Sequence, residues 1–167
     1  MKSLTLSTTT ALCTLLPFFG LAAPQTFQLT SNVAEAANVW AQEVSKVSQF
    51  LNVASTLSGI DFTDQATSAL AMERDELTQK QTLDEVFGSN PFVQAANSTL
   101  VGQGTFQTVV SLLQDMAWNG VSRIDNMDAI NHVRCTYVLP AIDAYFSAVA
   151  KETGGIQLLA VYPLACQ

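Results

Sequence analysis

The sequence predicts an all-α fold, a bundle of five or six helices stapled by one disulfide bond. Apolar residues recur at helical spacing along most of the chain beyond residue 30. No stretch combines strand-like alternation with hairpin turns. Glycines and one Asn-Pro pair stand between the helical stretches, where they end one helix and begin the next.

The first predicted helix covers residues 33–57. Ser31 or Asn32 suits its N-cap, and Gly59 follows its end. Residues 23–31 are expected to form a short mobile lead-in. The apolar stripe of this helix consists of Val33, Ala37, Trp40, Val44, Val47, Leu51 and Ala54.

The second predicted helix covers residues 63–87 and ends before Gly88. Asp61 near its start suits the positive end of the helix dipole. Glu76 and Lys80 are one turn apart and are expected to pair on the outside. The acidic residues of this helix match no calcium loop and are interpreted as a solvated face. They are Glu73, Asp75, Glu76, Asp84 and Glu85.

Three further helices are predicted: one from Pro91 that stops at Gly102, one from Thr105 that Gly120 ends, and one over residues 122–152. An Asn-Pro pair starts the first of them. A kink or a break is expected at Pro140 in the last, because proline lacks the backbone N–H. The aromatic residues expected in the core are Trp40, Phe50, Phe87, Phe92, Phe106, Tyr137, Tyr145 and Phe146.

Residues 1–22 are predicted to be a secretory signal peptide, which leaves residues 23–167 as a single helical domain. Lys2 supplies the positive charge, and residues 11–21 form an apolar run too short to span a bilayer. Small residues suit cleavage after Ala22. A membrane anchor is the alternative, but no polybasic flank follows the run. The protein is therefore expected to be extracellular, either free or associated with a cell wall.

The chain is acidic and sparsely charged. Its formal net charge is −7, and charged residues make up 13% of it, against about 25% in an average domain. No basic cluster occurs, so nucleic acid is not expected as a partner. No cofactor is expected either, since the only Gly-x-Gly stretch lacks the rest of a phosphate-binding loop.

Two cysteines remain beyond the signal peptide, Cys135 and Cys166, and an even number in a secreted chain predicts one disulfide bond. The bond would close a loop of about 31 residues and stabilise the protein by roughly 3–4 kcal/mol. The alternatives are free thiols or half of a metal site. With one histidine and no CxxC pair, no metal site is expected. Asn97 begins the only glycosylation sequon and is expected on an exposed surface.

Polar residues on apolar helix faces predict one structural site. Arg134 and Asn131 project toward the apolar side of the last helix, and Glu73 does the same on the second. Because buried charges need partners, Glu73 and Arg134 are predicted to form a structural ion pair, completed by Asn131. The alternative is that Arg134 reaches solvent at the edge of the bundle.

No catalytic residue is predicted. His132, the only histidine, projects away from the apolar face and is expected to be exposed. The chain contains neither a GxSxG nor an HExxH motif. A hydrolase that pairs His132 with a Ser or Asp from another helix stays open as a third-ranked alternative.

Four features resemble small secreted proteins of filamentous fungi. They are the Ala-Ala-Pro end of the signal segment and the stretches VWAQEVSKVSQFLN, GTFQTVVSLLQDMA and INHVRCTYVLPAIDAYF. The resemblance covers most of the mature chain and implies location and architecture, since that group has no established activity. The chain is more loosely similar to the fungal hydrophobic-surface-binding and cell-wall mannoprotein family. That similarity implies a secreted helical bundle and a fatty-acid-like ligand.

These observations favour a secreted, non-catalytic protein that binds an apolar ligand, such as a lipid or fatty acid, or a hydrophobic surface. The basis is the wide apolar helix faces, the low charge and the lack of a catalytic motif. The alternative is an effector or surface antigen that acts on a host or cell-wall partner. No individual ligand-binding residue and no oligomeric state are predicted.

Overall fold

Residues 25–167 are described in the computed structural model of the protein, with their side chains from Ser31 onward. Every regular element in this part of the chain is helical, which confirms the all-α prediction. The predicted signal peptide, residues 1–22, lies outside the described residues. No helix between residues 25 and 167 is long and apolar enough to cross a membrane.

The bundle that residues 25–167 form has four long helices, so the predicted count of five or six is wrong. The short segment formed by α3 (Pro91–Asn97) and the π-helical turn η2 (Ser98–Gly102) only covers one side of the bundle. It stays short because the chain turns at Gly104, which has a φ of +68°. The four long helices are α1 (Gln25–Val53), α2 (Gly59–Phe87), α4 (Thr105–Asn119) and a continuous helix made of α5 (Asn126–Val133), η4 (Arg134–Val138) and α6 (Leu139–Thr153).

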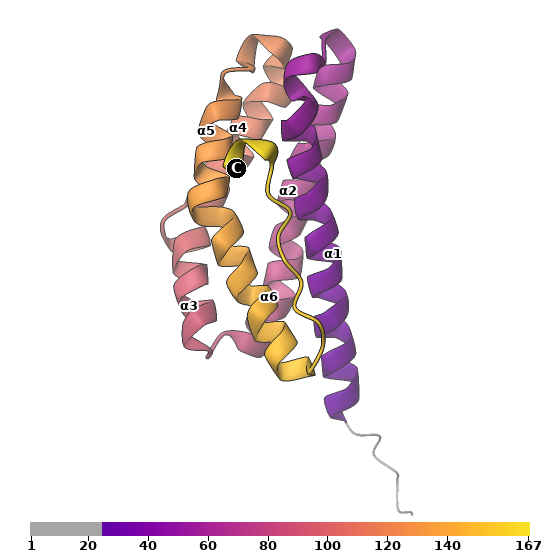
Figure 1. The fold of residues 1–167 in the computed structure, drawn as a ribbon, viewed down its shortest axis with the longest axis vertical. Helices are drawn as coiled ribbons and strands as arrows, with labels where there is room; N and C mark the ends of the chain where they lie inside the picture. Colours follow the sequence, from indigo (N-terminus) through magenta and orange to yellow (C-terminus); the bar gives the residue numbers. More distant parts are fainter. Residues whose placement is uncertain (1–24) are drawn as a thin grey trace, which may run out of the picture.

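The long helices pack in sequence order around one apolar core. α1 and α2 lie side by side, α4 packs against α2, and the α5–α6 helix closes the bundle against α4 and α1 (Figure 1). Trp40 lies at the centre, with its ring centroid 5.2 Å from that of Tyr145 and 5.8 Å from that of Phe146. Three short 3₁₀ turns complete the helical elements: η1 (Ala54–Thr56), η3 (Gly120–Arg123) and η5 (Leu164–Cys166).

The first helix begins earlier than the sequence predicts. α1 starts at Gln25, so the expected caps Ser31 and Asn32 lie inside the helix, and part of the expected lead-in, residues 23–31, is helical. Residues 25–32 contain neither glycine nor proline, so nothing in them stops the helix from extending toward its N-terminus.

Pro140 is accommodated without breaking the helix. The turn before it, η4, is π-helical, and the chain continues directly into α6. A π turn re-routes backbone hydrogen bonds around a residue that cannot donate one. The helix changes direction between α5 and α6 (Figure 1), as a kink at this proline predicts.

Two of the aromatic residues that were expected in the core are exposed. Phe92 is 74% exposed near the start of α3, and Tyr137 is exposed on η4. Both lie on the outward side of their helix, because Val93 and Val138, the next residue in each case, are the ones that face the core. The other six aromatic residues are buried: Trp40, Phe50, Phe87, Phe106, Tyr145 and Phe146.

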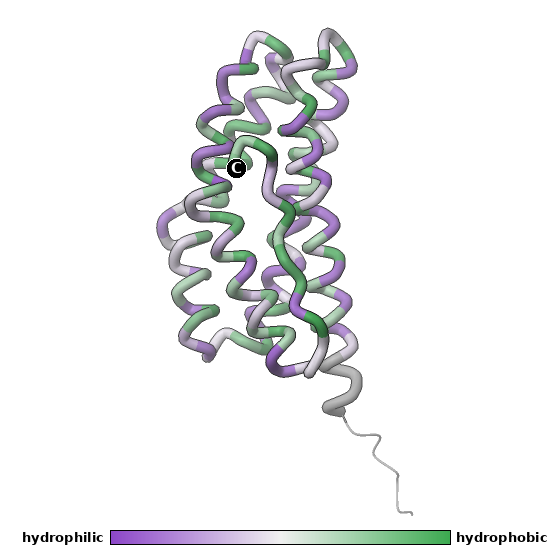
Figure 2. The backbone as a smooth tube through the Cα atoms, viewed as in Figure 1, coloured by the Kyte–Doolittle hydropathy of each residue, from purple (hydrophilic) through white to green (hydrophobic). Residues whose placement is uncertain are grey.

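The C-terminal tail, residues 154–167, runs back along the bundle as an extended segment. Gly154, with a φ of +66°, ends α6 and reverses the chain. The tail then crosses the face between α1 and the α5–α6 helix (Figure 1), and most of its length is hydrophobic (Figure 2). It carries several strongly exposed apolar side chains, namely Ile156, Leu159 and Leu164.

Candidate functional site

The disulfide bond between Cys135 and Cys166 is present and ties the end of the tail to η4. Side chains of the bundle hold the tail along its length as well. The polar anchors are Ser48 Oγ to the Val161 carbonyl (2.5 Å), the Leu164 N–H to Asn52 Oδ1 (2.7 Å), the Ala160 N–H to Asp143 Oδ1 (2.7 Å) and Tyr162 OH to Asp143 Oδ2 (3.0 Å). The tail is therefore fixed to both α1 and α6.

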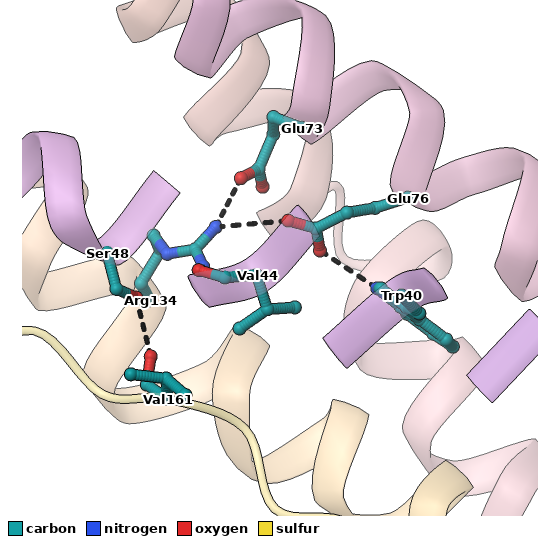
Figure 3. Close-up of polar contacts among 7 residues, drawn as sticks. All are labelled: Trp40, Val44, Ser48, Glu73, Glu76, Arg134 and Val161. Carbon is teal, nitrogen blue, oxygen red and sulfur yellow. Dashed lines mark hydrogen bonds and ion pairs between the residues drawn. The ribbon is translucent and has the colours of Figure 1, made fainter. Parts of the chain in front are cut away.

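Arg134 is fully buried beneath this tail, at the point where three helices meet. Its Nη1 donates to Glu73 Oε2 and lies 3.7 Å from Glu76 Oε1 (Figure 3). Its Nη2 donates to the Val44 carbonyl of α1 at 3.4 Å. The structure thus brings Glu73 and Arg134 together, as the helix projections predict. It also places a second carboxyl group beside Arg134, which the projections do not predict.

Glu76 is this second carboxyl group, and its predicted place was wrong. It is fully buried and accepts a hydrogen bond from the Trp40 indole N–H at 2.9 Å (Figure 3), instead of pairing with Lys80 on the outside. Lys80 is also buried and pairs with Asp84 at 2.5 Å. The reason is that α2 packs against both α1 and α4, so more than one side of this helix faces the interior.

The acidic residues of α2 therefore do not form one solvated face. Asp75 and Glu85 are exposed, whereas Glu73 and Glu76 are inside the core and Asp84 is half-buried. Asp84 accepts hydrogen bonds from Lys80 and, at 2.6 Å, from the hydroxyl of Tyr145. No group of acidic, histidine or cysteine side chains in the described part of the chain is arranged to hold a metal ion.

Burial dominates the electrostatics of the cluster formed by Glu73, Glu76 and Arg134, here called the Arg134 cluster. Desolvation, followed by the charge of Glu73, raises the pKa of Glu76 well above its usual range. Desolvation also raises the pKa of Glu73, although Arg134 opposes the change. Two carboxyl groups face one guanidinium, so the favoured state keeps a proton on one of them and balances the charge.

Glu43, on the neighbouring side of α1, is a further buried carboxyl group. Desolvation, followed by the nearby charge of Asp75, raises its pKa to about 7. Its Oε2 atom is buried without a hydrogen-bond partner among the described residues. Glu43 therefore titrates near neutral pH and adds to the pH dependence of the bundle.

The Arg134 cluster has no access to solvent, and this limits the roles that it can have. All three side chains have no accessible surface. A substrate cannot reach them without the helices opening, so the cluster is suited to holding α1, α2 and η4 together. Asn131, one turn before Arg134, is also buried, but no hydrogen bond from it to the ion pair is present.

His132 and Asn97 lie apart from this cluster. His132 is exposed, as expected, and its ring meets that of Tyr137 edge-on with centroids 6.3 Å apart. Asn97 is half-buried at the end of α3, less exposed than the sequon led us to expect. Glycosylation of Asn97 stays a prediction.

An apolar groove lies where the N-terminal half of α1, the end of α6 and the start of the tail meet. Its volume is about 410 Å³, within the range of small-molecule sites. Six of its nine lining residues are apolar, and none is charged. The apolar lining residues are Ala34, Ala37, Phe146, Val149, Ile156 and Leu158.

Sequence reasoning did not find this groove. Its residues come from three segments, and only the fold brings them together. The available signal was the charge-free, apolar composition of the tail, which gives no register against the helices.

Comparison with known proteins adds no relative: no protein-family model, no curated protein and no solved structure matches this chain.

Proposed function

We propose that this is a secreted, non-catalytic protein that binds an apolar ligand, such as a lipid or fatty acid, or a hydrophobic surface. The observation that carries the proposal is the apolar groove between α1, α6 and the tail. A groove of this size, lined mainly by aliphatic and aromatic side chains, is typical of sites for apolar small molecules.

The tail supports the proposal, because it extends the apolar surface beyond the groove. Ile156 is 94% exposed at the edge of the groove, and Leu159 and Leu164 are also strongly exposed. Large apolar side chains that lie together on a surface often mark a binding site. Since the disulfide bond and the polar anchors hold the tail, this surface needs little ordering when it binds.

The distribution of ionisable groups supports a non-catalytic role. Glu73 and Glu76, whose pKa values burial raises, are sealed in the core. Perturbed groups serve catalysis where they line a cleft that admits substrate. Here their position fits a structural role.

A fluorescence binding assay with the uncharged probe N-phenyl-1-naphthylamine tests the proposal. The wild-type protein should bind the probe, and Ile156→Asp should weaken binding, because it places a charge at the apolar rim. The matched control is Ile60→Asp, since Ile60 is 74% exposed in the first turn of α2 and does not line the groove. Circular dichroism checks that both variants fold. Equal binding by Ile156→Asp and wild type would contradict the assignment to this groove.

Native mass spectrometry of the mature protein, secreted from a eukaryotic host, gives a second test. A copurifying adduct of lipid size that is lost on denaturation supports a carrier. A mass that accounts only for the chain, its disulfide bond and a glycan counts against it.

A second function, that of an effector or surface antigen with a protein or cell-wall partner, is favoured by Phe92. This exposed aromatic residue lines a groove of about 190 Å³ with polar neighbours, among them Ser147 and Lys151. Exposed aromatic rings are frequent anchors at recognition surfaces. Under this alternative, Phe92→Ala reduces cosedimentation with insoluble cell-wall polysaccharide, and Ile60→Asp leaves it unchanged.

A further inference from the structure

The polar side chains that line the apolar groove are already engaged with the protein. The amide nitrogen of Asn38 donates to the Ala34 carbonyl at 2.8 Å, within α1. The hydroxyl of Thr153 donates to the Val149 carbonyl at 2.9 Å, within α6. The N–H of Gly155 donates to Thr153 Oγ1 at 3.3 Å. The second N–H of the Asn38 amide remains available, and it is an uncharged donor.

The groove also lacks a counter-charge for an anion. None of its lining residues is basic. Next to the lining in sequence, Glu35 follows Ala34 on α1, and Lys151 and Glu152 precede Thr153 on α6; all three are exposed, and one of them is basic. The whole chain carries a formal net charge of −7. A carboxylate drawn into this groove would lose its hydration without gaining a partner.

We infer that the ligand of this groove is a single alkyl chain with an uncharged polar head, such as a long-chain alcohol, and not an ionised fatty acid. This inference rests on the proposed function and specifies its ligand class. The chain fills the space between Phe146, Val149 and Leu158, while the hydroxyl group lies beside Asn38 and Thr153, partly removed from water. Such a head costs little desolvation and meets no repulsion from the surrounding carboxylates.

Displacement of N-phenyl-1-naphthylamine by 1-dodecanol and by dodecanoate, at pH 7.5 and low salt, tests the inference. The two competitors share chain length and differ in the charge of the head group. Dodecanol should bind at least about tenfold more tightly than dodecanoate, since an unpaired carboxylate loses more than that in desolvation. At pH 5, where part of the dodecanoate is protonated, the difference should shrink, with dodecanol as the reference for any change in the protein itself.

The outcomes separate the two claims. If dodecanoate binds as tightly as dodecanol at pH 7.5, the inference about the head group is overturned, while binding in the groove stands. A selective loss of dodecanoate binding in Lys151→Ala would also overturn it, because it would show that the exposed Lys151 on α6 accepts the carboxylate. If neither competitor displaces the probe and Ile156→Asp changes nothing, the proposed function fails and the inference fails with it.

Discussion

At the scale of single residues, Arg134 is a charged side chain with no access to solvent, so it requires buried partners. Its guanidinium lies fully inside the core and meets carboxyl groups at positions 73 and 76 of α2 and a carbonyl of α1. Residues three apart on a helix share one face, which is why both carboxyl groups reach the same guanidinium. Removal of one partner from such a cluster leaves buried charge without compensation.

Arg134→Met should therefore destabilise the protein strongly, by about 3–5 kcal/mol. The measurement is urea denaturation of the protein at pH 7, followed by tryptophan fluorescence, to which the buried Trp40 contributes. The matched control is Arg123→Met, because Arg123 is half exposed in its ion pair with Asp115 and should cost less than about 1 kcal/mol. If both variants lost the same free energy of unfolding, the buried ion pairs of Arg134 would matter no more to stability than an exposed one.

A triple variant distinguishes the cost of an unpaired buried charge from the net contribution of the whole Arg134 cluster to stability. Replacing Glu73 by Leu, Glu76 by Gln and Arg134 by Met removes all three charges and keeps an acceptor for the Trp40 indole N–H. Its free energy of unfolding should be closer to wild type than that of Arg134→Met, because apolar residues often replace a buried ionic group without loss. A triple variant less stable than the single one would instead indicate that the cluster itself stabilises the fold.

At the scale of elements, the tail depends on its attachments. The part of it ahead of η5 has no regular secondary structure, and the disulfide bond and a few hydrogen bonds fix it over α1 and α6. The tail supplies Ile156 and Leu158 to the wall of the groove. The disulfide bond therefore does not line the groove itself, but it holds in place the tail that forms one wall of the groove.

Cys135→Ser with Cys166→Ser should lower the free energy of unfolding by about 3–4 kcal/mol, since the unfolded chain regains the entropy of a loop of about 31 residues. Amide hydrogen exchange should rise along residues 156–166 well before it rises in α2. Probe binding in the groove should also weaken, because one wall becomes mobile. Unchanged exchange in the tail would show that the polar anchors suffice.

At the scale of the whole molecule, buried carboxyl groups set the response to pH. The pKa values of Glu43, Glu73 and Glu76 are all raised, mainly by burial. The folded protein consequently holds protons that the unfolded chain has released, over the interval from the ordinary value of 4.5 up to about 7 for Glu43. The stability that these three groups contribute is fully present below this interval and is lost as pH rises through it.

The free energy of unfolding should thus fall as pH rises from 5 to 8. Glu43→Gln should make this dependence shallower by up to one proton, or about 1.4 kcal/mol per pH unit. Chemical denaturation at a series of pH values measures both slopes. Glu35→Gln, on the exposed side of α1, is the matched control and should keep the wild-type slope. A stability that rises across this range would contradict the account of the buried carboxyl groups.

The sequence by itself determined the helical class, the positions of most helices and the polar pair at the centre. Apolar periodicity gives the inward face of a helix directly, and so Glu73 and Arg134 could be matched before their helices were placed. Cysteine parity predicted the disulfide bond. These features depend on local pattern or on counting, which a sequence contains in full.

The tertiary structure alone decided how many faces of each helix are buried and what the tail lies against. Glu76 and Lys80 looked like a surface pair because a single helix shows only its own amphipathicity, whereas α2 is covered by α1 and α4. The groove needs α1, α6 and the tail at once. Burial and concave shape arise from the relative placement of distant segments, and no local pattern encodes that placement.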